Sequence, residues 1–177
     1  MRIVLKNADV FNIGKADIAI ENGIISDIGS VSLNEGDMTF DLKGKVIFPG
    51  FVDVHTHLRE PGFSYKETIK TGTKASARGG FTHVFSMPNL NPGPDCYDGL
   101  KCQLDIIKKD AVINVIPFGA ITKGQMGEEL ADFESMSDYV AGFSDDGRGV
   151  QDEKMMLSAM NRARELNKVI SAHCEDN

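Results

Sequence analysis

Residues 49–60 read Pro-Gly-Phe-Val-Asp-Val-His-Thr-His-Leu-Arg-Glu, an apolar run that ends in two histidines, His55 and His57. Side chains alternate between the two faces of a β-strand, so both imidazoles point the same way if this run is a strand. Two imidazoles on one face can hold one metal ion. The pattern therefore predicts a strand over Phe51–His57 with a metal-binding end, and the alternative is two ordinary polar residues at a strand end.

From this strand onward, strand and helix patterns alternate along the chain. Five strands are predicted, over residues 51–57, 81–87, 112–118, 139–144 and 169–173, and helical apolar spacing lies between them. Alternating units of this kind form a parallel sheet with helices outside. Val52 and Val54, on the face opposite the histidines, are expected to pack against a covering helix.

The helices carry recognisable ends and apolar stripes. Ser64 and Glu67 have the spacing of a capping box, which predicts that the first helix begins near Ser64, and Gly79-Gly80 predicts its end. The apolar stripe of the last helix is predicted to consist of Met156, Ala159, Met160 and Ala163.

The fold class is predicted to be α/β. Residues 50–177 are predicted to form the first half of a metal-dependent (β/α)₈ barrel of the TIM type, incomplete because a closed barrel needs roughly 250 residues. An open doubly wound sheet is the alternative, but no Gly-x-Gly-x-x-Gly follows the first strand. Residues 1–49 contain short strands and turns, with a hairpin signal at Asn22-Gly23, and are predicted to form a small β module.

Polar residues collect where the predicted strands end. They are His55, His57, Arg59 and Glu60 after the first strand, Asn89 after the second, Asp145-Asp146 after the fourth and His173 after the fifth. The carboxyl ends of parallel barrel strands share one rim, and a carboxylate there can bridge two metal ions. The rim therefore predicts a two-metal site, although Asp145-Asp146-Gly147 taken alone is more typical of a turn.

Two other side chains on this rim are suited to a substrate. Arg59 offers a fork of donors that fits a carboxylate, and Asn89 can both donate and accept at its amide. Beside a metal pair they indicate a small anionic substrate that carries amide groups; the alternative is that they serve solubility and turn capping. His83 lies in the middle of a predicted strand and is assigned no function.

Charge and cysteine content narrow the class of protein. The formal net charge of the 177 residues is −7 and no basic block occurs, which argues against nucleic acid and anionic membranes as partners. The sequence has no apolar run of transmembrane length and no signal-peptide pattern at its start. Three cysteines form no even framework and fit reduced thiols, so a cytoplasmic location is expected.

As a set, the motifs resemble the N-terminal part of the dihydroorotases, a family of the amidohydrolase superfamily. The motifs are residues 49–62, Lys66-Glu67-Thr68, residues 79–82, Met87-Pro88-Asn89, residues 143–147 and residues 173–176. The resemblance implies a (β/α)₈ barrel with a small β-sandwich built from both chain ends, so that residues 1–49 would be the N-terminal part of the sandwich. It also implies reversible closure of N-carbamoyl-L-aspartate to L-dihydroorotate in pyrimidine (UMP) biosynthesis.

The resemblance also implies roles for individual residues. Zn²⁺ would be the cofactor, with two ions in a complete site. The implied metal ligands are His55 and His57 for one zinc, Asp146 as the bridging carboxylate and His173 for the second zinc, and the implied substrate-binding residues are Arg59 and Asn89. Hydantoinases and allantoinases often use a carboxylated lysine as the bridge. The matching segment here has no lysine, which favours the bacterial dihydroorotases, whereas Leu90 stands where that family often has threonine.

A further histidine ligand and the aspartate that acts as general base come from later strands in the family, so no catalytic base is assigned within these residues. We therefore expect the chain alone to be inactive. We also expect it to be marginally stable, to self-associate through open strand edges, or to be a fragment of a longer protein, and the intact motifs favour the fragment. The alternatives are another cyclic-amide hydrolase, such as a dihydropyrimidinase, hydantoinase or allantoinase, and a non-catalytic subunit. The resemblance further implies a homo-oligomer or association with aspartate carbamoyltransferase.

Overall fold

The computed structural model describes residues 1–175, and the chain divides between Pro49 and Gly50 into two compact units. The first unit is a single sheet. Its strands are β1 (Arg2–Val10), β2 (Gly14–Glu21), β3 (Ile24–Gly29), β4 (Met38–Asp41) and β5 (Val46–Ile47). The order is β3-β2-β1-β4, with β5 also paired to β1; β2 runs antiparallel to both its neighbours, and β4 and β5 run parallel to β1.

The predicted hairpin turn lies between β2 and β3. Asn22 and Gly23 both have positive φ, 53° and 80°, as this type of turn requires. Small buried clusters hold the sheet together, one around Val4 and another around Ile18. Ile24, at the start of β3, stays 72% exposed, so part of the apolar surface of this unit is uncovered by the described residues.

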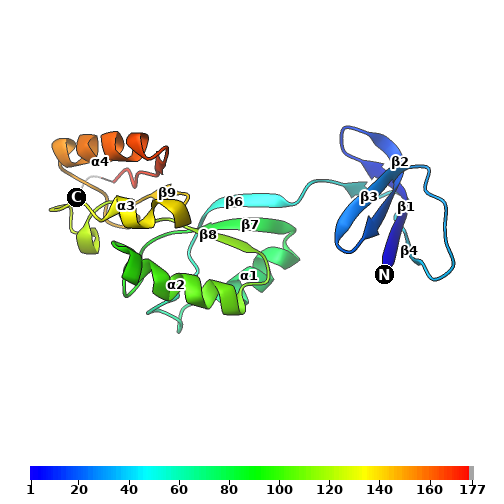
Figure 1. Cartoon of the computed structure of the whole chain (residues 1–177), viewed down its shortest axis with the longest axis horizontal. Helices are drawn as coiled ribbons and strands as arrows, with labels where there is room; N and C mark the ends of the chain where they lie inside the picture. The colour runs from blue at the N-terminus through cyan, green and yellow to red at the C-terminus, as the bar shows by residue number, and fades with distance from the viewer. Residues whose placement is uncertain (176–177) are drawn as a thin grey trace. The chain divides into compact units, whose positions relative to one another are not determined.

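The second unit alternates strands and helices. Its strands are β6 (Phe51–Thr56), β7 (Phe81–Ser86), β8 (Asn114–Pro117), β9 (Gly142–Phe143) and β10 (Val169–Ile170). Its helices are α1 (Ile69–Arg78), α2 (Tyr97–Asp110), the short α3 (Phe133–Met136) and α4 (Glu153–Glu165), with 3₁₀ turns η1 (Lys123–Gln125) and η2 (Ser137–Tyr139). Figure 1 shows α1 and α2 beside the β6-β7-β8 sheet.

All five strands of this unit are parallel and neighbour one another in chain order. β6-β7-β8 form one sheet and β9-β10 another. Backbone bonds connect them: the amide of Ala141 donates to the carbonyl of Pro117 at 2.9 Å, and that of Gly119 donates to Gly142 at 3.0 Å. At Gly142 a Cβ would lie 2.3 Å from the carbonyl oxygen of Val169, so only glycine fits where β9 lies against β10.

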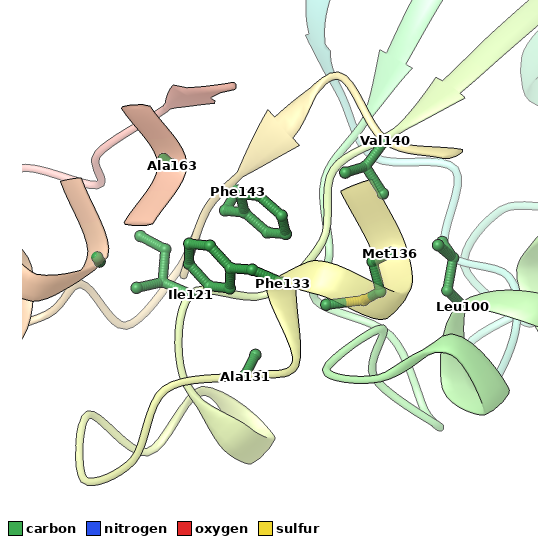
Figure 2. Close-up of a cluster of buried hydrophobic side chains, with 9 residues drawn as sticks. Leu100, Ile121, Ala131, Phe133, Met136, Val140, Phe143 and Ala163 are labelled. Carbon is green, nitrogen blue, oxygen red and sulfur yellow. The ribbon is translucent and has the colours of Figure 1, made fainter. Parts of the chain in front are cut away.

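Two apolar layers fix the sheet to its helices. Val84 on β7 packs with Ile69 of α1, and Ile107 of α2 packs against the same cluster, so both helices cover one face of the sheet. A second, larger cluster joins α2, α3, β9 and α4 (Figure 2). At its centre the rings of Phe133 and Phe143 stack, with centroids 3.7 Å apart and planes 9° from parallel.

The predicted start of the first helix is wrong. α1 begins at Ile69, and its capping box is formed by Thr68 and Thr71 rather than Ser64 and Glu67. The reason is that acceptors for the first turn are available here: the Glu60 carboxylate accepts from the amide of Ile69 at 2.8 Å, and the Thr68 hydroxyl accepts from the amide of Thr71 at 3.1 Å. The predicted end is confirmed, since Gly79 is the C-cap.

Other expectations also differ from the structure. Val52 and Val54 remain 53% and 61% exposed, because no helix of the described residues covers their face of β6. In α4, Ala159 and Ala163 are buried but Met160 is 53% exposed, since it lies beyond the edge of the buried stripe. The fourth and fifth strands are shorter than predicted; within residues 1–175, β10 pairs only with β9.

Candidate metal centre

Four parallel strands bring polar side chains to one place. His55 lies near the end of β6 and His57 directly after it. Asn89 follows β7, Asp146 follows β9 and His173 follows β10. Each residue thus lies at or just beyond the carboxyl end of its strand, where parallel strands present their side chains to a common rim.

The carboxylate of Asp146 is the centre of this group, and its side chain is only 7% exposed. Its Oδ1 lies 3.3 Å from His55 Nε2 and 3.5 Å from His173 Nδ1. Its Oδ2 lies 3.5 Å from His57 Nε2. The ligand atoms of His55, His57 and Asp146 all lie within 4.8 Å of one another, a spacing at which one metal ion can bind all three.

Asn89 connects two members of the group. Its Nδ2 donates to Oδ2 of Asp146 at 3.1 Å, and its Oδ1 lies 3.1 Å from Nδ1 of His57. The carboxamide therefore contacts the ring nitrogen of His57 that faces away from Asp146. Metal-binding histidines commonly place their second ring nitrogen against such a partner.

His173 has a second acidic neighbour. Its Nε2 lies 2.8 Å from Glu175 Oε2, while Nδ1 faces Asp146. The hydrogen bond to Glu175 raises the pKa of His173, attraction to Asp146 acts in the same direction, and desolvation opposes both. Asp176, the last residue of the motif that begins at His173, lies outside the described residues.

The adjacent Asp145 has a different role. It is 1% exposed, and its carboxylate accepts hydrogen bonds from the amides of Ile121 (2.8 Å) and Thr122 (3.2 Å) and from the Thr122 hydroxyl. Burial raises the pKa of Asp145, and these hydrogen bonds oppose the rise. Asp145 thus ties the loop after β8 to the loop after β9, on which Asp146 sits.

Arg59 is not joined to this group by any contact. It has a positive φ of 59°, and its carbonyl accepts from the amide of Phe63 at 2.9 Å. Among residues 1–175 its guanidinium forms no hydrogen bond or ion pair, so its donors are free to bind another molecule.

Sequence reasoning missed three contributors to the centre. Glu175 could have been found from its position two residues after His173. Gln125, whose Nε2 donates to the Asp146 carbonyl at 3.3 Å, and Thr122 come from the loop after β8 and have no local signal. His83, by contrast, contacts Thr82 and Asn114 and does not contact Asp146, in agreement with its lack of an assigned role.

The donor set suits a divalent transition metal. Imidazole nitrogen and carboxylate oxygen are ligands that zinc accepts, and three such groups converge here around one buried carboxylate. His55 and His173 approach Oδ1 of Asp146, and His57 approaches Oδ2. Each oxygen of this carboxylate therefore has at least one imidazole nitrogen near it. The residues present therefore fit a metal ion.

Comparison with known proteins identifies related sequences. The dihydro-orotase-like family model matches residues 44–177. A dihydroorotase of Fusobacterium nucleatum is 49% identical over 178 residues, which cover 99% of this chain and 42% of the relative. A dihydroorotase of Bacillus thuringiensis is 46% identical over 182 residues and is likewise covered to 42%. The chain thus spans less than half the length of these relatives.

Solved structures support the fold. An L-hydantoinase (dihydropyrimidinase) from Arthrobacter aurescens superposes with a TM-score of 0.79 at 18% identity, covering 95% of this chain and 39% of that one. A dihydropyrimidinase from Brevibacillus agri also gives 0.79, at 23% identity over 100% of this chain and 41% of that one. The chain therefore has the mixed α/β fold found in part of these hydrolases.

Proposed function

Because the chain belongs to the dihydro-orotase-like family of cyclic amidohydrolases, we propose that its protein is a dihydroorotase. The reaction is the reversible cyclisation of N-carbamoyl-L-aspartate to L-dihydroorotate, in the biosynthesis of pyrimidines. The observation that carries this proposal is the convergence of three histidines on Asp146, in a chain 46–49% identical to dihydroorotases.

In this proposal the metal is zinc. His55 and His57 would hold one ion, and Asp146 and His173 would help to hold a second. Zinc supplies Lewis acidity at neutral pH, which favours attack at an amide or carboxyl carbon. The role of Asp145 is to keep the loop that carries Asp146 in place, through its bonds to residues 121 and 122.

Arg59 and Asn89 are proposed to hold the substrate carboxylate. The guanidinium of Arg59 has a planar fork of donors that matches a carboxylate and has no partner within residues 1–175. The side chain of Asn89 already lies beside the metal centre. A small anionic substrate would thus be held next to the group that activates it.

The two units are proposed to be parts of a larger fold. The parallel order of β6 to β10 fits the first part of a (β/α)₈ barrel at residues 50–177, and the single sheet of residues 1–49 fits one part of a β-sandwich. The exposed faces of Val52 and Ile24 are the surfaces that the remaining elements of such a fold would cover. No helix in residues 1–175 is long and apolar enough to span a membrane.

The proposal also covers the location of the protein and its assembly. The three cysteines, Cys96, Cys102 and Cys174, are unpaired in the structure, which fits a reducing cytoplasm. The family resemblance favours self-association of the protein or association with aspartate carbamoyltransferase, and open strand edges favour self-association as well.

A second candidate is hydrolysis of another cyclic amide, such as a hydantoin or dihydropyrimidine. The structural likeness to hydantoinases favours it, but that likeness shows the fold rather than the substrate. The acidic Asp145-Asp146 pair, in the segment where these enzymes often carry a lysine, favours the dihydroorotase instead.

The test is a substrate comparison on the complete natural gene product. The rate of ring closure of N-carbamoyl-L-aspartate is measured by chromatography of the dihydroorotate formed. We expect this rate to exceed the rates of hydantoin and dihydrouracil hydrolysis. His55→Ala should abolish closure and reduce bound zinc, measured by elemental analysis, whereas His83→Ala should leave both unchanged. Preference for hydantoin would replace this proposal with the second candidate. The 177-residue chain alone is expected to be inactive.

A further inference from the structure

Asn89 lies between a carboxylate and an imidazole, and the chemistry of both neighbours constrains how its carboxamide is oriented. The ionised carboxylate of Asp146 can only accept hydrogen bonds, so the group of Asn89 that faces it must be the NH₂ donor. The amide oxygen of Asn89 then faces Nδ1 of His57, at 3.1 Å. The reverse orientation would place two acceptor oxygens against each other.

The orientation of Asn89 in turn determines where the proton of His57 resides. An amide oxygen has no proton to donate, so Nδ1 of His57 must carry the hydrogen of that contact. A neutral imidazole has only one N–H, so its Nε2 then holds a lone pair. Nε2 lies 3.5 Å from Asp146 Oδ2, on the side where the ligand atoms converge, and forms no hydrogen bond with that carboxylate in the described residues. The shorter contact of Nδ1 with Asn89 therefore decides where the proton lies.

We propose that Asn89 is a positioning residue, which uses the charge of Asp146 to hold His57 in the tautomer whose Nε2 is free to bind metal. This inference rests on the metal site of the proposed function, and it gives Asn89 a role that needs no substrate. The same carboxylate that would bridge the metals thereby prepares one of their ligands. A metal ion entering the site would meet a lone pair at Nε2 without prior transfer of a proton from that nitrogen.

A second carboxamide–imidazole pair in the chain provides a control. Asn114 on β8 places its Nδ2 3.1 Å from Nε2 of His83 on β7, so here the amide nitrogen, rather than the amide oxygen, faces the ring. None of the contacts of this pair reaches Asp146. Asn114→Ala should therefore change the surroundings of His83 and leave the metal centre unaffected.

The test measures the tautomer and the zinc affinity separately, in the complete gene product without substrate. Nitrogen-15 NMR of the metal-free protein, at a pH where His57 is neutral, reports which ring nitrogen carries the proton. We expect Nδ1–H in the wild type. In Asn89→Ala we expect Nε2–H to be populated and zinc affinity to fall by about 10–100-fold, the usual effect of removing a partner of a metal ligand. Asn114→Ala should change neither the tautomer of His57 nor the zinc affinity.

Two results would overturn the inference. One is a wild-type His57 with its proton on Nε2, which needs no variant to observe. The other is an Asn89→Ala protein that keeps the wild-type tautomer, whatever its zinc affinity, because Asn89 would then act on substrate or on structure alone. Since neither measurement uses dihydroorotate, a protein that shows the tautomer effect but no ring closure would refute the proposed function and leave this inference standing.

Discussion

Replacing Asp145 with alanine should destabilise the second unit strongly, because three buried donors depend on its carboxylate. Oδ1 accepts from the amides of Ile121 and Thr122, and Oδ2 accepts from the amide and hydroxyl of Thr122. The side chain is 1% exposed, so water does not reach these donors in the intact fold. The hydrogen bonds of Asp145 therefore hold the loop after β8 against the loop after β9.

The size of the effect follows from the number of donors left without a partner. A buried donor that loses its acceptor costs about 1–3 kcal/mol. The Thr122 hydroxyl can rotate toward another acceptor, so the two amides set the loss, and Asp145→Ala should lower the free energy of unfolding by about 2–6 kcal/mol. Asp145→Asn keeps one acceptor oxygen for the amide of Ile121 but replaces the second oxygen, which accepts from Thr122, with an NH₂ group. The free energy of unfolding should therefore fall by less, about 1–3 kcal/mol.

Urea denaturation of the complete gene product measures these losses, and hydrogen exchange shows where they act. In Asp145→Ala the amides of Ile121 and Thr122 should exchange faster, whereas the amide of Leu100, in α2, should change only as much as global stability does. A stability within about 0.5 kcal/mol of the wild type, the usual range for surface changes, would refute the reasoning. So would unchanged protection at residues 121 and 122.

Two further changes test other parts of the fold. Phe133→Ala removes one ring of the stack with Phe143 and should lower the free energy of unfolding by about 3–5 kcal/mol in urea denaturation, whereas a loss below about 1 kcal/mol would mean that the cluster repacks. In the first unit, hydrogen bonds from Lys6 and from the amide of Asn7 hold the pKa of Asp17 below its usual value. The stability that this contributes is present above the unfolded-state pKa and is lost as pH falls through the lower folded-state pKa. Lys6→Ala should raise the pKa of Asp17, measured by carboxyl NMR titration, and weaken this acid-induced loss; an unchanged pKa would show that the backbone amides alone set it.

Local pattern was sufficient for much of the fold and for the histidines of the candidate metal centre. Strand periodicity placed His55 and His57 on one face of β6, and the structure brings both Nε2 atoms to Asp146. The alternation of strands and helices predicted the parallel order of β6 to β10. These features depend on the spacing of neighbouring residues and on the common rim of parallel strands, so they can be read without coordinates.

Some expectations failed because residues outside the pattern decided the outcome. The first helix begins at Ile69 rather than near Ser64, since Glu60 supplies an acceptor to its first turn. Val52 and Val54 belong to an apolar face, as the pattern indicated, but whether a helix covers such a face depends on the placement of other segments.

Asp145 and Asp146 show most clearly what the sequence determined by itself and what only the tertiary structure decided. The sequence determined that a pair of carboxylates follows a strand on the rim where the histidines lie. Only the packing of the loop after β8 decided that Asp145 turns toward the amides of Ile121 and Thr122. Asp146 is then left facing the three histidines and Asn89. The physical reason is that a buried carboxylate adopts the direction in which donors are available, and those donors come from segments far away along the chain.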